Sequence, residues 1–259
     1  MLYTLNAGPA RATFDPKHGG RLTSLCVSGL ELLVGPEDDP MAYGCYPMTP
    51  WAGRVRDGRF SWQGQAYQLP INHPPHAIHG TVFQRSWEVE GETLRIDLGP
   101  DWPWAGKAIS RVQLAPDELV WSIEVHAQDV EMPAVIGWHP WFRRQLGRGE
   151  PLDLSFDAQG MMRRDSAGIA TPDIVGVSRG PWDDCFVGVA EPVRLIWSNA
   201  LSLTVESDCL YWVIYDEPDH ALCVEPQSGP PDAFNLGLAS TVKPGTPMIR
   251  TMKIRWELG

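Results

Sequence analysis

The chain has 259 residues, 43% of them hydrophobic, which is enough to bury a large core, and we expect one domain over residues 1–259. Its formal net charge of -11 opposes binding to nucleic acid or to an anionic membrane, so the expected partner is a small molecule. No apolar run reaches the ~20 residues that cross a bilayer, and the opening segment MLYTLNAGPARATFD has no signal-peptide pattern. We therefore expect a cytoplasmic protein that is a monomer or a weak homodimer.

Three segments predict β-hairpins. Strand-like runs flank Gly64 in FSWQGQAYQL, Gly91 in SWEVEGETLRIDL and the pair Pro116-Asp117 in VQLAPDELVWSI. Glycine, proline and aspartate supply the backbone conformations that tight turns need. Antiparallel neighbours are therefore expected along much of the chain.

Two further segments alternate apolar and polar residues with the period of a half-buried strand. In LVWSIEVHA the apolar side chains on one face are Leu119, Trp121, Ile123 and Val125. In TMKIRWEL they are Met252, Ile254, Trp256 and Leu258. Few windows carry a helical period, so the sequence predicts an all-β fold, a large antiparallel β-sandwich.

The segment WAGRVRDGRF carries three arginines. Arg54 is the best candidate for a binding role, because it lies beside Gly53 and follows Trp51. The guanidinium group, a forked hydrogen-bond donor, then lies next to an aromatic ring, a combination that suits a sugar. For Arg56 and Arg59, solvated positions around a turn are an equally good interpretation.

The segment INHPPHAIHG holds His73, His76 and His79, followed by Gly80, which allows close approach of a backbone or a ligand. Three histidines with a glutamate could bind zinc, but the segment lacks the H-x-x-x-H spacing of a helical site. The five cysteines form no C-x-x-C pair, so neither a zinc knuckle nor a disulfide framework is indicated. We expect buried thiols and no bound metal.

Two polar residues end apolar runs directly before a proline. His139 follows the run AVIGW and precedes Pro140, and Glu225 follows ALCV and precedes Pro226. Because proline restricts the residue before it and donates no ladder hydrogen bond, we expect each strand to end there. Either residue alone could be a satisfied polar group of the core. Together, an imidazole with an ordinary pKa of ~6.5 and a carboxylate whose pKa is raised by burial form an acid and base couple.

Taken in order, PWAGRVRDGRF, HAIHG, GWHPWF, PWDDCF and CVEPQSGPPDAFN resemble the motifs of the aldose 1-epimerase (galactose mutarotase) family, with matching spacing along nearly the whole chain. The resemblance implies the family's large β-sandwich and an acid/base ring opening of a free aldose without a cofactor. By position it implies that Glu225 is the catalytic base, His139 the general acid and His79 a second catalytic histidine.

The same motifs supply candidate substrate-binding residues. Arg54 and Asp183 match sugar-binding positions of the family that this chain resembles. We add His76, from HAIHG, and Trp138, from GWHPWF, as further candidates for contact with the sugar.

Several motif positions depart from the common pattern of that family. Thr81 replaces a glycine, Trp141 a tyrosine and Arg143 an asparagine, and His76 stands where asparagine is usual. The identity of the sugar therefore stays open.

A hexose 6-phosphate is one alternative substrate. A sister group that resembles this chain acts on such phosphates, and it would need several arginines around the dianion. The chain offers Arg54, Arg59, Arg85, Arg143 and Arg144. That group usually carries an arginine where this chain has Phe83, so we expect a neutral aldose.

Two other classes of protein would also use a sugar pocket. A glycoside hydrolase would pair Glu225 with Asp183 or Asp184, but an imidazole partner argues against it. A silent sugar-binding module would tolerate the loss of Glu225 or His139, and both are present.

Overall fold

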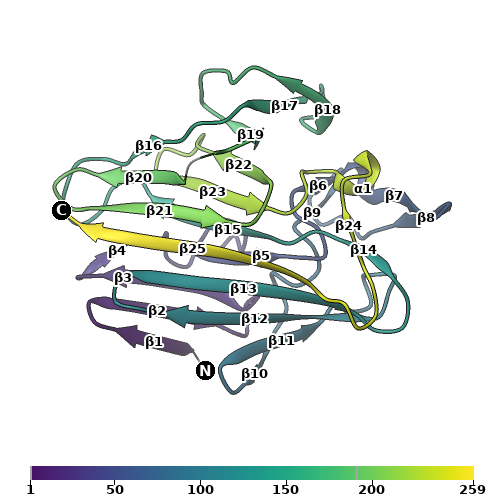
Figure 1. Ribbon diagram of the computed structural model, residues 1–259, viewed down its shortest axis with the longest axis horizontal. Helices are drawn as coiled ribbons and strands as arrows, with labels where there is room; N and C mark the ends of the chain where they lie inside the picture. Colours follow the sequence, from purple (N-terminus) through teal and green to yellow (C-terminus); the bar gives the residue numbers. More distant parts are fainter. Residues whose placement is uncertain (1, 191) are drawn as a thin grey trace.

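The computed structural model describes residues 2–190 and 192–259, and its regular structure is almost entirely β-strand (Figure 1). The larger sheet contains, in spatial order, β1 (Tyr3–Ala7), β2 (Ala10–Asp15), β3 (Arg21–Val27), β5 (Cys45–Met48), β15 (Gly137–Arg143), β23 (Ala221–Gln227), β22 (Tyr211–Tyr215), β19 (Asp183–Val187), β17 (Gly160–Arg164) and β18 (Ala170–Val175), with β4 (Leu30–Glu31) paired to β3. We call it the eleven-stranded sheet.

The eight-stranded sheet contains, in spatial order, β10 (Glu88–Glu90), β11 (Thr93–Asp97), β12 (Gly106–Leu114), β13 (Glu118–Ala127), β25 (Met248–Leu258), β21 (Leu201–Ser207), β20 (Val193–Trp197) and β16 (Asp153–Ser155). Neighbouring strands in both large sheets pair antiparallel. The predicted all-β antiparallel sandwich is therefore confirmed.

Smaller elements lie at one end of the sandwich (Figure 1). The two-stranded pairs are β14 (Met132–Ala134) with β24 (Ser240–Val242), β6 (Arg54–Val55) with β9 (Ala77–Ile78), and β7 (Arg59–Trp62) with β8 (Gln65–Gln68). The helical elements are the 3₁₀ turn η1 (Arg56–Gly58) and the short helix α1 (Ala233–Leu236). Within the described residues no helix is long and apolar enough to cross a bilayer.

The three predicted hairpins form as β7–β8, β10–β11 and β12–β13. The last of these pairs without a break from Gly106 opposite Ala127 to Leu114 opposite Leu119. Long uninterrupted ladders of this kind satisfy the backbone and leave one face free to bury apolar side chains.

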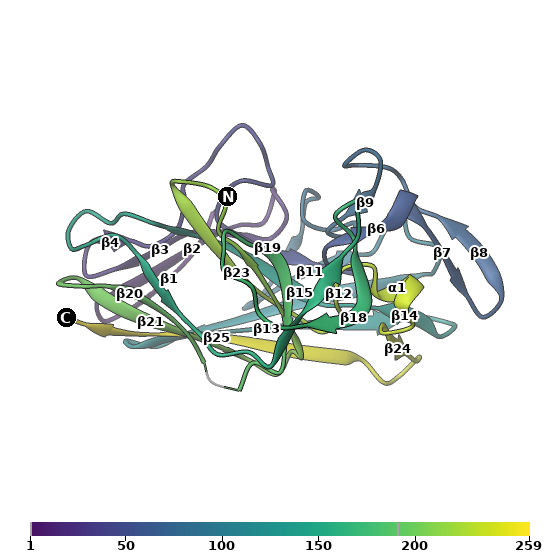
Figure 2. The ribbon, with the colours of Figure 1, turned by 90° about the horizontal axis from the view of Figure 1, so that it is seen from above.

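The main core lies between the two large sheets (Figure 2). The four predicted inward residues of β13 have no exposed surface, and on β25 Met252 and Ile254 are equally buried. Phe14 of β2 meets Trp121 of β13 edge to face across the core, with ring centroids 5.1 Å apart. The prediction was wrong for Leu258, which is 50% exposed because it is the last residue of β25, at the rim of the sandwich.

The central strands of the eleven-stranded sheet differ, because β15 and β23 are buried on both faces. The prediction that these strands end before Pro140 and Pro226 was wrong: both strands continue through their proline. Paired residues flank the prolines, with Gly137 opposite Gln227 and Trp141 opposite Cys223, but no pair forms between these positions. The strands accommodate proline by giving up ladder hydrogen bonds there.

Candidate active site

A cavity of about 270 Å³ opens on the face of the eleven-stranded sheet that is turned away from the main core. The sheet contributes to its lining Tyr46, His139, Trp141, Cys185, Tyr215, Glu225 and Gln227. The loops and short strands around β6 and β9 contribute Gly53, Arg54, His73, Ile78 and His79, while Arg164 and Asp183 come from β17 and β19. Segments far apart in the sequence therefore meet over the centre of one sheet.

The floor of the cavity holds a buried imidazole and carboxylate. His139 Nε2 lies 3.2 Å from Glu225 Oε1, and both side chains are more than nine-tenths buried. The register on either side of the two prolines sets these residues opposite one another on neighbouring strands. Gln227, two residues beyond Glu225 and on the same face, donates from Nε2 to Glu225 Oε2 at 3.2 Å.

Burial decides how this couple holds its proton. Burial raises the pKa of Glu225 well above its usual value, and the negative charge of Asp183 adds to the rise. Burial lowers the pKa of His139, and the positive charge of Arg21 lowers it further. In the ligand-free pocket the couple therefore favours its uncharged form, in which Glu225 carries the shared proton and His139 is a neutral imidazole.

A column of rings fixes the orientation of His139. Tyr46 stacks on it at 4.8 Å between ring centroids, and Trp141 stacks on it at 5.3 Å. The His79 ring meets His139 edge-on at 5.1 Å. Behind Tyr46 lies Arg21, which is fully buried, with its guanidinium carbon 4.7 Å from the centre of the Tyr46 ring. The imidazole is thus held by packing against three rings.

The HAIHG loop brings His79 into the cavity. His79 has a left-handed backbone (φ 61°), and its N–H donates to the carbonyl of Gly53 at 3.1 Å. At Gly80 a Cβ atom would lie 2.0 Å from the Thr49 carbonyl oxygen. The glycine therefore allows the close approach of the Thr49 backbone. Burial lowers the pKa of His79 well below its usual value, which keeps the ring neutral.

Arg54 and Asp183 meet at the wall of the cavity, with Arg54 Nη1 3.3 Å from Asp183 Oδ2. Arg164 of β17 adds a second cation, 3.5 Å from Asp183 and 2.9 Å from Asp184. Both arginines also line the cavity, so their remaining donors can reach a ligand.

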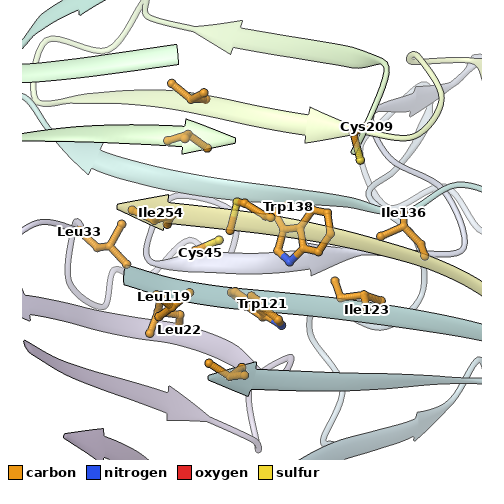
Figure 3. Close-up of a cluster of buried hydrophobic side chains, with 14 of the residues drawn as sticks. Leu22, Leu33, Cys45, Leu119, Trp121, Ile123, Ile136, Trp138, Cys209 and Ile254 are labelled. Atoms are coloured by element: carbon orange, nitrogen blue, oxygen red, sulfur yellow. The ribbon is translucent and has the colours of Figure 1, made fainter. Parts of the chain in front are cut away.

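Two predicted substrate-binding residues lie outside the cavity lining. Trp138 has no exposed surface and belongs to the main core, because it alternates with His139 along β15 and so points to the opposite face (Figure 3). His76 is turned toward η1, where its Nδ1 accepts the backbone N–H of Asp57 at 3.1 Å. Neither placement supports contact with a sugar.

Several lining residues were missed from the sequence. They are Tyr46, His73, Arg164, Tyr215 and Gln227. Strand alternation could have found Gln227, which is two residues after Glu225. Nothing local marks Tyr46 or Arg164, because tertiary pairing alone brings them to His139 and Asp183.

The arginines considered for phosphate binding do not converge, and only Arg54 lines the cavity. Arg59 donates to Gln68 at 2.9 Å and Arg85 to the Asp97 carbonyl at 2.8 Å. Arg143 donates to the Leu33 carbonyl at 2.7 Å and Arg144 to the Pro218 carbonyl at 2.9 Å. These side chains stabilise loops elsewhere.

All five cysteines are free thiols, and four are buried, as expected, whereas Cys26 is partly exposed. Among the described residues, one group could hold a metal ion. Its possible ligand atoms, from His139, Cys223 and Glu225, lie within 4.8 Å of one another.

A large antiparallel sandwich of this kind is the fold of galactose mutarotase-like proteins. The chain belongs to the aldose 1-epimerase family, whose model matches residues 1–255. It is 26% identical to the Escherichia coli K12 protein YihR over 91% of this chain and 86% of that one.

Solved structures share the fold. A galactose mutarotase-like protein from Clostridium acetobutylicum superposes with a TM-score of 0.86 at 18% identity, covering 99% of this chain and 95% of the other. The galactose 1-epimerase from Lactobacillus acidophilus NCFM gives 0.79 at 20% identity, covering 100% of this chain and 95% of the other. At these identities the structural likeness establishes the fold alone.

Proposed function

We propose that the protein is an aldose 1-epimerase, which interconverts the α and β anomers of a free aldose. The observation that carries the proposal is the buried His139–Glu225 couple, 3.2 Å apart on the floor of the cavity. Membership of the aldose 1-epimerase family agrees with it.

The couple provides both proton transfers that ring opening needs. Moving the shared proton from Glu225 to His139 across the 3.2 Å contact gives a carboxylate base beside an imidazolium acid. Glu225 then takes the proton of the anomeric hydroxyl while His139 protonates the ring oxygen, and the bond between C1 and the ring oxygen breaks. Rotation about C1–C2 and the reverse transfers close the ring on the other face and restore the couple.

Neighbouring side chains would position the sugar and form hydrogen bonds with its oxygen atoms. His79 is neutral and its Nδ1 has no hydrogen-bond partner among the described residues, so it is free to bond a hydroxyl or the open-chain oxygen. Arg54 and Asp183 offer a donor and an acceptor on the facing wall. Trp141 and Tyr215 give the aromatic surface on which a pyranose face can pack.

The charges of the cavity favour a neutral sugar. Apart from the couple, the charged lining residues are Asp39, Arg54, Arg164, Asp183 and Glu217. Both arginines already contact Asp183, so the described lining residues offer no cluster of free guanidinium groups for a dianion. The same contacts disfavour a hydrolase that pairs Glu225 with Asp183. The cytoplasmic location and the monomeric or weakly dimeric state stay predictions.

Polarimetry on freshly dissolved α-D-glucose, α-D-galactose and other aldoses tests the proposal. We expect the protein to accelerate mutarotation of at least one of them. Glu225→Gln should retain the fold, measured by circular dichroism, and should lower kcat by at least the ~10²-fold typical of a lost general base. A folded Glu225→Gln protein with kcat near that of the wild type, or no acceleration of any aldose, would contradict the proposal.

A further inference from the structure

The pocket-facing side of β15 and β23 brings together three side chains of different chemistry. Cys223 and Glu225 are two residues apart on β23 and so share a face, and His139 stands opposite on β15. Their ligand atoms lie within 4.8 Å of one another, and all three residues are buried. Two neighbouring strands hold the cluster.

We propose that this cluster is a binding site for Zn²⁺ and that zinc, by occupying it, inhibits the enzyme. Thiolate, imidazole and carboxylate are the three side-chain ligands of zinc, whereas Mg²⁺ and Ca²⁺ prefer oxygen ligands alone. The inhibition, though not the binding, rests on the epimerase activity proposed above.

The distances suit a tetrahedral ion. With bonds of the usual length, two ligands of a tetrahedral zinc site lie roughly 3.3–3.6 Å apart. The His139 Nε2 to Glu225 Oε1 distance of 3.2 Å matches this separation. The cysteine sulfur starts no more than 4.8 Å from the other two atoms, so a shift of about 1 Å brings it into range.

Gln227 can supply a fourth ligand. The amide of Gln227 already contacts Glu225 through Nε2 at 3.2 Å, and its Oε1 has no hydrogen-bond partner among the described residues. This side chain lines the cavity, so either its oxygen or a water from the cavity can complete the tetrahedron.

Occupation of the cluster would stop both proton transfers. Zinc would bind the lone pair of His139 Nε2 and an oxygen of Glu225, the two atoms that face each other in the couple. The Cys223 thiol and the Glu225 carboxylic acid would each release a proton to solvent as the ion binds. Cys223 itself has no part in the proposed ring opening, so removing its sulfur separates the metal site from the catalytic one.

Cobalt binding tests the site without any sugar. Co²⁺ added to the metal-free protein should bind at one equivalent and give the near-ultraviolet charge-transfer band of a thiolate ligand. Cys223→Ala and Cys223→Ser should abolish the band. Cys185→Ala is the matched control, because Cys185 is a buried thiol that lines the same cavity outside the cluster. Loss of the band in Cys185→Ala, its survival in both Cys223 variants, or its absence in the wild type would overturn the site.

Mutarotation in the presence of Zn²⁺ tests the inhibition. Zinc should inhibit the wild type and Cys185→Ala equally, and a chelator should restore full activity. Cys223→Ala should keep its basal rate and need about 10- to 100-fold more zinc for the same inhibition. Equal sensitivity of the two variants, or binding of zinc without inhibition, would refute this part. If no aldose is turned over, the epimerase proposal fails, and the cobalt spectrum still decides the metal site.

Discussion

The two large sheets of this protein are built on different principles. In the eight-stranded sheet, β13 alternates strictly between buried and half-buried residues and pairs with β12 and β25 without a break. In the eleven-stranded sheet, β15 and β23 are buried on both faces, contain proline and lack ladder pairs with each other at the His139–Glu225 couple. Regular strands stabilise the sandwich, and irregular ones carry the residues of the proposed chemistry.

This division has an energetic basis. Each ladder hydrogen bond contributes about 1 kcal/mol net, and each proline removes one donor. A carboxylic acid buried beside an imidazole adds a desolvation cost that only partial hydrogen bonding offsets. The site therefore depends on the surrounding core to hold it in place, as strained functional sites usually do.

Removing a large side chain from the regular sheet should have the largest effect on stability. Trp121 is fully buried, packs against Phe14 and donates to Ser110 Oγ at 2.7 Å. Trp121→Ala should lower the free energy of unfolding in urea by about 3–5 kcal/mol, because it leaves a cavity in the core. Leu258→Ala, at an exposed position of the same sheet, should change it by less than about 0.5 kcal/mol. The folded fraction of Trp121→Ala should keep a kcat within twofold of wild type, and a specific loss of catalysis would break the division between the sheets.

The pH dependence of kcat/KM should reflect the protonation state of the His139–Glu225 couple. With one shared proton the couple is competent; at low pH both groups are protonated and no base remains, whereas at high pH neither is protonated and no acid remains. Because burial lowers the pKa of His139 below its ordinary 6.5, the acid limb of kcat/KM should lie below pH 6.5. Because burial raises the pKa of Glu225 above its ordinary 4.5, the couple keeps its proton to higher pH than a solvated glutamate.

The rate should fall about tenfold per pH unit beyond each limb. Stopped-flow polarimetry in chelator-treated buffer measures this profile. An acid limb at or above pH 6.5 would mean that His139 is charged in the free enzyme.

The preference for a neutral over a phosphorylated sugar should depend on Asp183, the carboxylate that contacts Arg54 and Arg164. Wild type should prefer glucose to glucose 6-phosphate. Asp183→Asn should reduce this preference about three- to tenfold, because Arg54 loses its carboxylate partner and Arg164 keeps only Asp184. The change should shrink in ~0.5 M salt, where screening weakens the guanidinium groups. Arg143→Ala is the control and should leave the ratio unchanged, since Arg143 lies outside the cavity and bonds the Leu33 carbonyl. A phosphate preference that falls in Arg143→Ala would reverse the assignment.

The smallest effect is expected at His76. Its Nδ1 accepts the Asp57 N–H outside the cavity, and asparagine, with an amide oxygen, can accept the same bond. His76→Asn should therefore change kcat/KM by less than about twofold and leave folding intact. A tenfold loss of kcat/KM in the folded variant would return His76 to the sugar site.

The contrast between the sheets also explains what the sequence could reveal. Alternation identified β13 because only one of its faces is buried. In β15 it gave no signal, since both faces are buried, and Trp138 was wrongly assigned to the sugar side. His139 and Glu225 stood out only because proline follows each in an apolar run. Arg164 could not be found, since the pairing of β17 with β19 alone brings it to the cavity. That the whole chain is one domain stays a prediction.

The two prolines of β15 and β23 also matter before the chain has folded. The runs AVIGW and ALCV that precede His139 and Glu225 are apolar and uncharged, which is the composition of segments that stack into cross-β aggregates. Pro140 interrupts the first run and Pro226 interrupts the second. Neither proline can donate a hydrogen bond to an intermolecular β-ladder. We therefore expect the residues that interrupt the ladder around the couple also to hinder self-association of the newly made chain.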